Sequence, residues 1–176
     1  MKKINFIFLF SVVMIIASGI FITDGYCAST YESSVYGIKT QVPDGWKVIN
    51  MDDEEVPGDF QPVFEMKRKK PIDGKNPVAT MQIKKDTVTD IEKFGRDFLS
   101  NLQKQGFRVL RQQIITIDGK PAFDATAEMV VGQIRVKNSW VVMNGKKYLF
   151  MLTLSDTDSA AVENEVAQLL DSIQYK

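Results

Sequence analysis

The sequence contains no histidine and a single cysteine, Cys27. Without histidine the chain cannot form a Ser-His-Asp triad, a histidine-centred zinc site or a histidine pH switch. With one cysteine it cannot form an intrachain disulfide, so the folded part must be stable through its core alone. These shortages exclude several common catalytic and metal-binding arrangements.

The chain also has no excess of one charge, because 22 Lys and Arg residues balance 22 Asp and Glu residues. Removal of residues 1–27 would take away Lys2, Lys3 and Asp24 and leave a net charge of about −1. A near-neutral domain has no general attraction for nucleic acid, so we expect no nucleic-acid partner. The methionines are scattered among apolar positions, as in core filling. We expect no metal and no cofactor.

A long hydrophobic run is present at the N-terminus. Lys2 and Lys3 precede residues 4–22, which are predominantly apolar. A positive end, an apolar stretch and then small or polar residues are typical of a bacterial export signal. The stretch is close to the roughly 20 residues that span a bilayer. Residues 1–27 are therefore interpreted as a signal peptide or an uncleaved N-terminal anchor, and the remainder as periplasmic or at the outer face of the inner membrane.

Cys27 bears on how this segment is processed. Gly25 and Cys27 are small enough for signal-peptidase cleavage after Cys27, and cleavage after Ser29 is an alternative. A lipobox has small residues before its cysteine, whereas Tyr26 is bulky, so we do not expect a lipoprotein. One domain is assigned to residues 31–176.

The segment YGIKTQVPDGWKVI, residues 36–49, combines a strand pattern with a turn. Its first seven residues alternate with the period of two that marks a half-buried strand. Pro43 fixes its own backbone and Gly45 tolerates positive φ, so we expect the chain to reverse there. Trp46 begins the next strand. We interpret its ring as a lid on one end of the core rather than a ligand-stacking side chain.

Two segments have the apolar periodicity of amphipathic helices. The first follows Thr89 or Asp90, either of which can cap it, and ends at Gly106. The second begins after Asp156 or Asp158. The predicted strands are residues 36–42, 46–49, 63–69, 78–85, 107–117, 122–131, 134–143 and 146–155.

Two predicted hairpins specify cross-strand neighbours. A two-residue turn at residues 132–133 places Ala125 opposite Trp140 and Glu128 opposite Lys137. A small residue then fits beside a large one, and an acid meets a base.

The dipeptide Asn-Gly at residues 144–145 is the strongest short hairpin signal, because both residues accept positive φ. A two-residue turn there places Trp140 opposite Leu149 and Val142 opposite Lys147.

The densest charge cluster is a basic run around a predicted turn, made of Lys67, Arg68, Lys69, Lys70 and Lys75. Such runs usually form a solvated surface, and here the charges would protect a strand edge from aggregation. The alternative is a docking patch for an acidic partner or a weak contact with anionic lipid, which would make binding sensitive to salt.

Acidic residues suggest little chemistry. The acids at residues 52–55 lack the spacing of a calcium loop. Asp124 and Glu128 share one face of a predicted strand, but about 13 Å separates them at about 3.3 Å per residue. An inverting glycosidase pair lies roughly 6.5–9.5 Å apart, and Glu128 has Lys137 as a partner. We therefore identify no catalytic residue.

The chain resembles the PsbP-like superfamily, the group of PsbP and DcrB-type exported domains. The resemblance rests on an aromatic-Gly-Ile strand followed by Pro-x-Gly-Trp, on the meander with DGKPAFDATAEM and on a final helix ending LLDSIQ. The residues of the first motif are Tyr36, Gly37, Ile38, Pro43, Gly45 and Trp46. The resemblance implies an α+β fold, an α/β/α sandwich with a curved, mainly antiparallel sheet and two principal helices. It also implies a non-enzymatic function.

These observations predict an exported, non-catalytic binding or assembly-assisting module of the bacterial cell envelope. Its partner would be an envelope protein that the sequence does not name. The alternative is a carboxylate-dependent hydrolase of the periplasm, with Asp124 and Glu128 as its acids.

Overall fold

The computed structural model describes residues 29–51 and 58–176. The predicted signal or anchor, residues 1–27, and the acids at residues 52–55 lie outside this part. The elements in chain order are β1 (Thr30–Ser33), β2 (Ile38–Gln41), β3 (Trp46–Asn50), β4 (Gln61–Arg68), β5 (Val78–Lys84), α2 (Ile91–Lys104), β6 (Arg108–Ile117), β7 (Lys120–Val131), β8 (Ile134–Asn144), β9 (Leu149–Ser155), α3 (Ala160–Ser172) and β10 (Gln174–Tyr175). Among these elements, no helix has the length and apolar character needed to cross a membrane.

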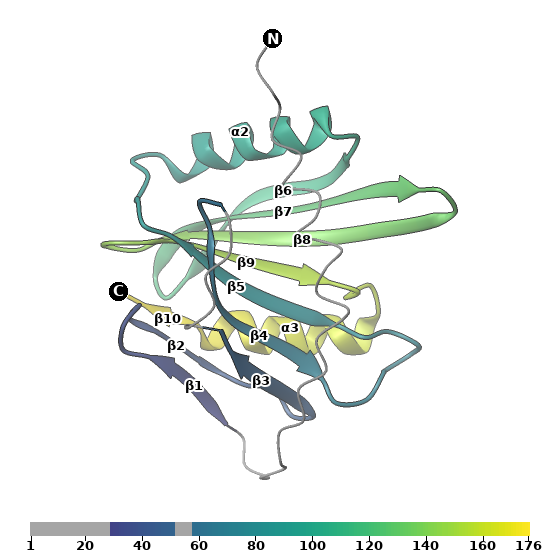
Figure 1. Cartoon of the computed structure of the whole chain (residues 1–176), viewed down its shortest axis with the longest axis horizontal. Coiled ribbons are helices and arrows are strands. Elements are labelled where there is room, and N and C mark those ends of the chain that lie inside the picture. The colour runs from purple at the N-terminus through teal and green to yellow at the C-terminus, as the bar shows by residue number, and fades with distance from the viewer. Residues whose placement is uncertain (1–28, 52–57) are drawn as a thin grey trace.

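The described strands form two sheets. Seven strands are ordered β3-β4-β5-β9-β8-β7-β6, and each neighbouring pair is antiparallel. The smaller sheet has the order β1-β2-β10. Helix α2 lies over one face of the large sheet, while α3 and the small sheet lie on the other (Figure 1). This arrangement confirms the predicted α+β class and its α/β/α layering.

Each face of the large sheet carries its own core, because successive strand residues point to opposite faces. Ala122 packs in the core on the α3 side, and its neighbour Phe123 packs in the core under α2. Burial on both faces explains why β9 is almost continuously apolar, with Leu149, Phe150, Met151 and Leu152 all buried.

The β7–β8 hairpin has the predicted register. Ala125 lies opposite Trp140, and Glu128 lies opposite Lys137. Trp140 is buried against helix α2, where the ring of Phe98 meets it edge-on with centroids 5.6 Å apart. The small Ala125 leaves room for the indole beside it.

The β8–β9 register was predicted wrongly. Asn144 lies opposite Leu149, and residues 145–148 form the connection, with the Gly145 N–H donating to the Tyr148 carbonyl over 3.0 Å. Trp140 therefore lies opposite Thr153 rather than Leu149.

In the same way, Val142 lies opposite Met151 rather than Lys147. The difference between the predicted and observed registers is four residues. Because four is an even number, every side chain of the strand keeps its predicted face.

The helix ends follow local capping rules. The Asp90 carboxylate accepts a 2.8 Å hydrogen bond from the Lys93 N–H and caps α2. Gly106 follows α2 with a φ of 95°. Ser159 caps α3, so this helix begins just beyond the predicted Asp158.

The turn before Trp46 connects the two sheets. Trp46 N–H donates to the Pro43 carbonyl over 3.0 Å, and Gly45 has a φ of 79°. Strand β2 before the turn lies in the small sheet, and β3 after it lies in the large sheet. The turn therefore passes the chain from one layer to the other, and the two strands do not form a hairpin with each other.

Candidate functional site

The basic run contains side chains with acidic partners inside the protein. Lys67 Nζ lies 2.9 Å from the Glu65 carboxylate on the same strand. Arg68 Nη2 lies 2.8 Å from the carboxylate of Glu165 on α3. Both cations are half-buried, so part of the predicted docking patch stabilises the fold.

The turn beyond β4 continues this pattern. Lys75 Nζ lies 2.7 Å from Asp158 and 3.5 Å from Asp156. The hydrogen bond with Asp158 raises the pKa of Lys75. Lys69 and Lys70 are exposed. These two are the members of the run best placed to meet a partner.

Trp46 is bonded to Glu165, the same carboxylate that pairs with Arg68. Its ring is buried, and its Nε1–H donates a 2.7 Å hydrogen bond to Glu165 Oε2. The hydrogen bond from Arg68 lowers the pKa of Glu165, and burial opposes that effect. In this position the indole closes the α3-side core and has its polar atom paired within the protein.

Asp124 lies on the face of β7 that points away from α2. Its carboxylate lies 2.9 Å from Arg111 Nη2 and accepts a 2.7 Å hydrogen bond from Gln113 Nε2. Asp124 is buried, but the Arg111 side chain that covers it is largely exposed.

Glu128 has a similar environment further along the strand. Arg108 Nε donates to its carboxylate over 3.1 Å, and Arg135 Nη1 lies 3.8 Å from it. The hydrogen bond from Arg108 lowers the pKa of Glu128, while burial acts in the opposite direction. The predicted neighbour Lys137 contributes charge from the opposite strand.

This arrangement favours a structural role for the two acids. A general acid needs a raised pKa, and a nucleophile needs access to the substrate. Asp124 and Glu128 are covered by basic side chains, and the pKa of Glu128 is shifted downward. Within residues 29–51 and 58–176, no group of three or more acids could hold a metal ion.

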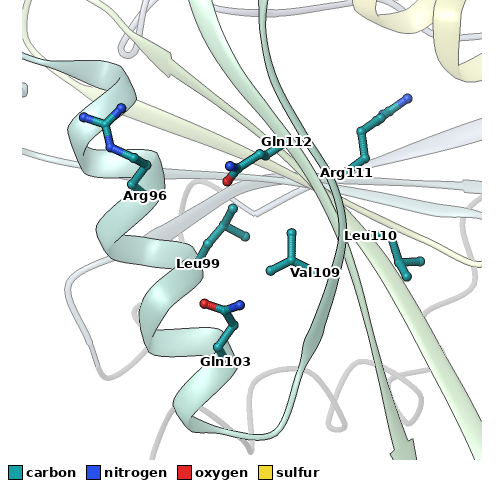
Figure 2. A pocket seen from close by; sticks show the side chains of 7 residues that line it. All are labelled: Arg96, Leu99, Gln103, Val109, Leu110, Arg111 and Gln112. Atoms are coloured by element: carbon teal, nitrogen blue, oxygen red, sulfur yellow. The ribbon is translucent and has the colours of Figure 1, made fainter.

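A hollow of about 290 Å³ lies between α2 and β6. Figure 2 shows Leu99 of the helix facing Val109 of the strand, while Leu110 lies beyond the strand. The residues around the hollow are Arg96, Leu99, Gln103, Val109, Leu110, Arg111 and Gln112. The small volume is at the lower limit for a typical ligand pocket of about 300–1,000 Å³.

Strand β6 is also the last strand at one end of the large sheet. The ladder with β7 skips Leu110 between Val109 and Arg111, which marks a bulge. Leu110 and Ile114 are exposed on this strand. The sequence analysis did not identify this site, although adjacent Val109 and Leu110 break the period of two, which is a signal for a bulge.

No family model matches the sequence, and no curated protein matches it. Solved structures match its fold. The solution structure of cyanobacterial PsbP (CyanoP) from Synechocystis sp. PCC 6803 superposes with a TM-score of 0.62 at 17% identity, over 90% of this chain and 98% of that chain. The chain has a PsbP-like fold.

A second structure supports the PsbP-like assignment. LpqN, described as involved in cell envelope biogenesis of Mycobacterium tuberculosis, superposes with a TM-score of 0.52 at 17% identity. The match covers 78% of this chain and 82% of LpqN. At this identity the likeness shows the shared fold of the PsbP-like domain.

Proposed function

We propose that this PsbP-like domain is an exported, non-catalytic binding or assembly-assisting module of the bacterial cell envelope. The positive and apolar N-terminal sequence supports export. The fold shared with LpqN supports a role in the envelope. The acids Asp124 and Glu128, both bonded to arginine, make the hydrolase alternative the weaker one.

The observation that carries the proposal is the open edge at β6. An edge strand presents backbone N–H and C=O groups that an added strand can pair with. Leu110 and Ile114 are exposed there, and Leu110 borders the hollow against α2. An extended segment of an envelope protein would pair along β6 and bury these side chains. The bulge at Leu110 would restrict the register in which that segment binds.

Site-specific photo-crosslinking in cells tests this proposal. A benzophenone amino acid at Leu110 should give a discrete adduct, whose partner mass spectrometry identifies. Ile114→Glu should remove that adduct without changing the melting temperature, because Ile114 is exposed. Val35, exposed in the small-sheet layer, is the matched control position. Absence of an adduct at Leu110, or equal adducts at both positions, would contradict binding at β6.

The basic run is a second docking surface for the same function. We propose that its exposed residues, Lys69 and Lys70, attract an acidic partner. Replacing both by Glu should weaken partner recovery at low salt and leave the fold intact. Arg68 should be kept, because its replacement would also break the ion pair with Glu165. Recovery unaffected by the reversal would leave only the solvated-surface interpretation.

A further inference from the structure

The β7–β8 hairpin ends in exposed apolar side chains. Val130, Val131 and Ile134 expose 63%, 54% and 68% of their surface. In Figure 1 the hairpin extends outward past the ends of the neighbouring strands. Clustered exposed aliphatic side chains at the end of a projecting element are costly in water and indicate a contact surface.

Both faces of this tip carry exposed aliphatic side chains. Val131 lies opposite Ile134 across the turn, and Val130 lies opposite Arg135. Because opposite residues share a face and successive residues alternate, Val131 and Ile134 point to one face and Val130 to the other. Apart from Gly132 and its two chain neighbours, no atom of the described residues lies within 4 Å of where a Cβ on Gly132 would be.

Basic side chains lie on the Val130 face of the hairpin, beside the tip and just behind it. Arg108 and Arg135 have 72% and 69% of their side chains exposed, and Lys137 lies on the same face. Glu128 is their shared acidic neighbour, with 9% of its side chain exposed. The charge of Lys137 also acts on Asp158, but Asp158 is ion-paired with Lys75, so the three cations exceed the acids near them and this part of the hairpin is positively charged.

We propose that the β7–β8 hairpin binds an anionic phospholipid surface. Val130, Val131 and Ile134 enter the boundary between headgroups and acyl chains, and the three cations bind lipid phosphates. Lys137 lies three residues behind Ile134, or about 10 Å at about 3.3 Å per residue. An apolar surface at this boundary is buried about 5–10 Å deep. Lys137 and Arg108, both opposite Glu128, are therefore at the height of the headgroups. Arg135 lies opposite Val130, and its long side chain can extend back to the same level.

The backbone of the hairpin is suited to this position. Its ladder is continuous as far as the pair Val131 and Ile134, so the peptide groups that face across the hairpin are paired. The described ladders with β6 and β9 end at Glu128 and Asn138, so the outer sides of the tip need water, and the tip enters no deeper than the hydrated headgroup boundary. Unpaired peptide groups are what usually prevents strands from entering a bilayer. A tip with exposed aliphatic side chains on both faces also fits a lipid layer, which surrounds it, better than a flat protein surface, which would cover one face. This inference uses residues distinct from the apolar contact residues proposed on β6.

The test measures depth at the hairpin in the full chain. Cys27→Ser removes the native thiol, and Ile134→Cys carries a nitroxide label. Vesicles contain phosphatidylcholine alone or an equal mixture with phosphatidylglycerol. We expect the label to gain oxygen accessibility and lose accessibility to a water-soluble nickel complex only on the mixed vesicles. Because depth is read at the label, binding by residues 4–22 does not imitate this result.

A label at Val35→Cys is the matched control. Val35 is 70% exposed and lies on the small-sheet layer, so it should remain in water on both kinds of vesicle. Replacing Arg108, Arg135 and Lys137 by Gln should lower the ratio of inserted to free label roughly 100-fold, at about fivefold per cation. If this variant melts early, Val130→Ser with Val131→Ser provides the second test, because both side chains are exposed.

Several results would overturn the proposal. The first is a label at residue 134 that stays in water on mixed vesicles, and the second is equal insertion into phosphatidylcholine alone. If the label loses access to the nickel complex without vesicles, and more so at higher protein concentration, the tip binds a second copy of the chain instead. If the label loses access to the nickel complex only when envelope protein is added, the tip binds a protein partner instead.

Discussion

The indole Nε1–H of Trp46 donates a 2.7 Å hydrogen bond to Oε2 of Glu165, a residue 119 positions later in the chain. The same carboxylate accepts bonds from Arg68 Nε at 3.0 Å and Nη2 at 2.8 Å. Glu165 thus joins α3 to β3 and β4 through three donors. This geometry explains why one arginine of the basic run is a structural residue.

Glu165→Gln should reduce stability at neutral pH, by roughly 1–3 kcal/mol for a charge-assisted hydrogen-bond pair. Because the pKa of Glu165 is lowered from its usual 4.5, the ionised form stabilises the folded state. This contribution is complete above about pH 4.5 and is lost as the pH falls through the lower folded-state pKa. Denaturant melts at several pH values should therefore show wild type and variant converging in acid.

Glu163→Gln is the matched control on the same helix, because Glu163 is exposed. It should change stability by less than about 0.5 kcal/mol. A Glu165→Gln deficit that persists unchanged in acid would show that packing, rather than charge, is lost.

Gly95→Ala should destabilise the protein, although alanine is the better helix former by about 1 kcal/mol. A Cβ at position 95 would lie 2.2 Å from the ring of Phe123. Phe123 is buried in the core under α2, so helix or ring must move, and overpacking of this kind costs about 1–3 kcal/mol. Thermal melts measure the change, and Ser100→Ala at an exposed position of α2 is the control. Stabilisation by Gly95→Ala would refute the close contact.

Tyr175→Phe should be neutral or slightly stabilising at pH 7. The hydroxyl of Tyr175 is buried and has no hydrogen-bond partner among the residues that the structure describes, and such a group costs about 1–3 kcal/mol. Burial, together with the charge of Asp118, raises the pKa of Tyr175 to about 12.

The raised pKa gives the tyrosine a pH signature. The folded state keeps its proton while the unfolded state loses it near pH 10, so the stability of the folded state falls as the pH rises from about 10 towards 12. Tyr175→Phe should flatten this alkaline loss of stability. The ultraviolet titration of the folded variant should also lack the tyrosinate step near pH 12. Persistence of that step would assign it to another tyrosine.

Local patterns in the sequence predicted the elements that local physics determines. Asp90 caps a helix because its side chain needs only the next turn of the backbone. The turn at residues 132–133 likewise determines the β7–β8 register. The Asn-Gly signal at residues 144–145 failed because neither residue has the positive φ that a two-residue type I′ turn requires, and Gly145 is instead packed between distant groups. A Cβ there would lie 2.6 Å from the Lys176 carbonyl and 2.8 Å from Phe150.

The small sheet and the candidate sites depend on long-range contacts that a single sequence does not display. Strands β1 and β10 have four and two residues, too few for a periodicity to be visible. The basic run was evident as a charge cluster, but the pairing of Arg68 with Glu165 spans 97 positions. Exposed Val130 and Val131 looked like ordinary strand residues, because the sequence alone does not show where a hairpin leaves the body of the fold.

The small sheet has a consequence for the timing of folding. Strand β10 pairs with β2, and the Lys176 N–H donates to the Gly37 carbonyl over 3.1 Å. The last residues of the chain thus complete a sheet begun by the first residues of the domain. On the proposed export route, with the N-terminus first, this pairing could not form until residues 174–176 had emerged from the secretion channel. The order of strands would thus delay completion of the small sheet until those residues have crossed the membrane.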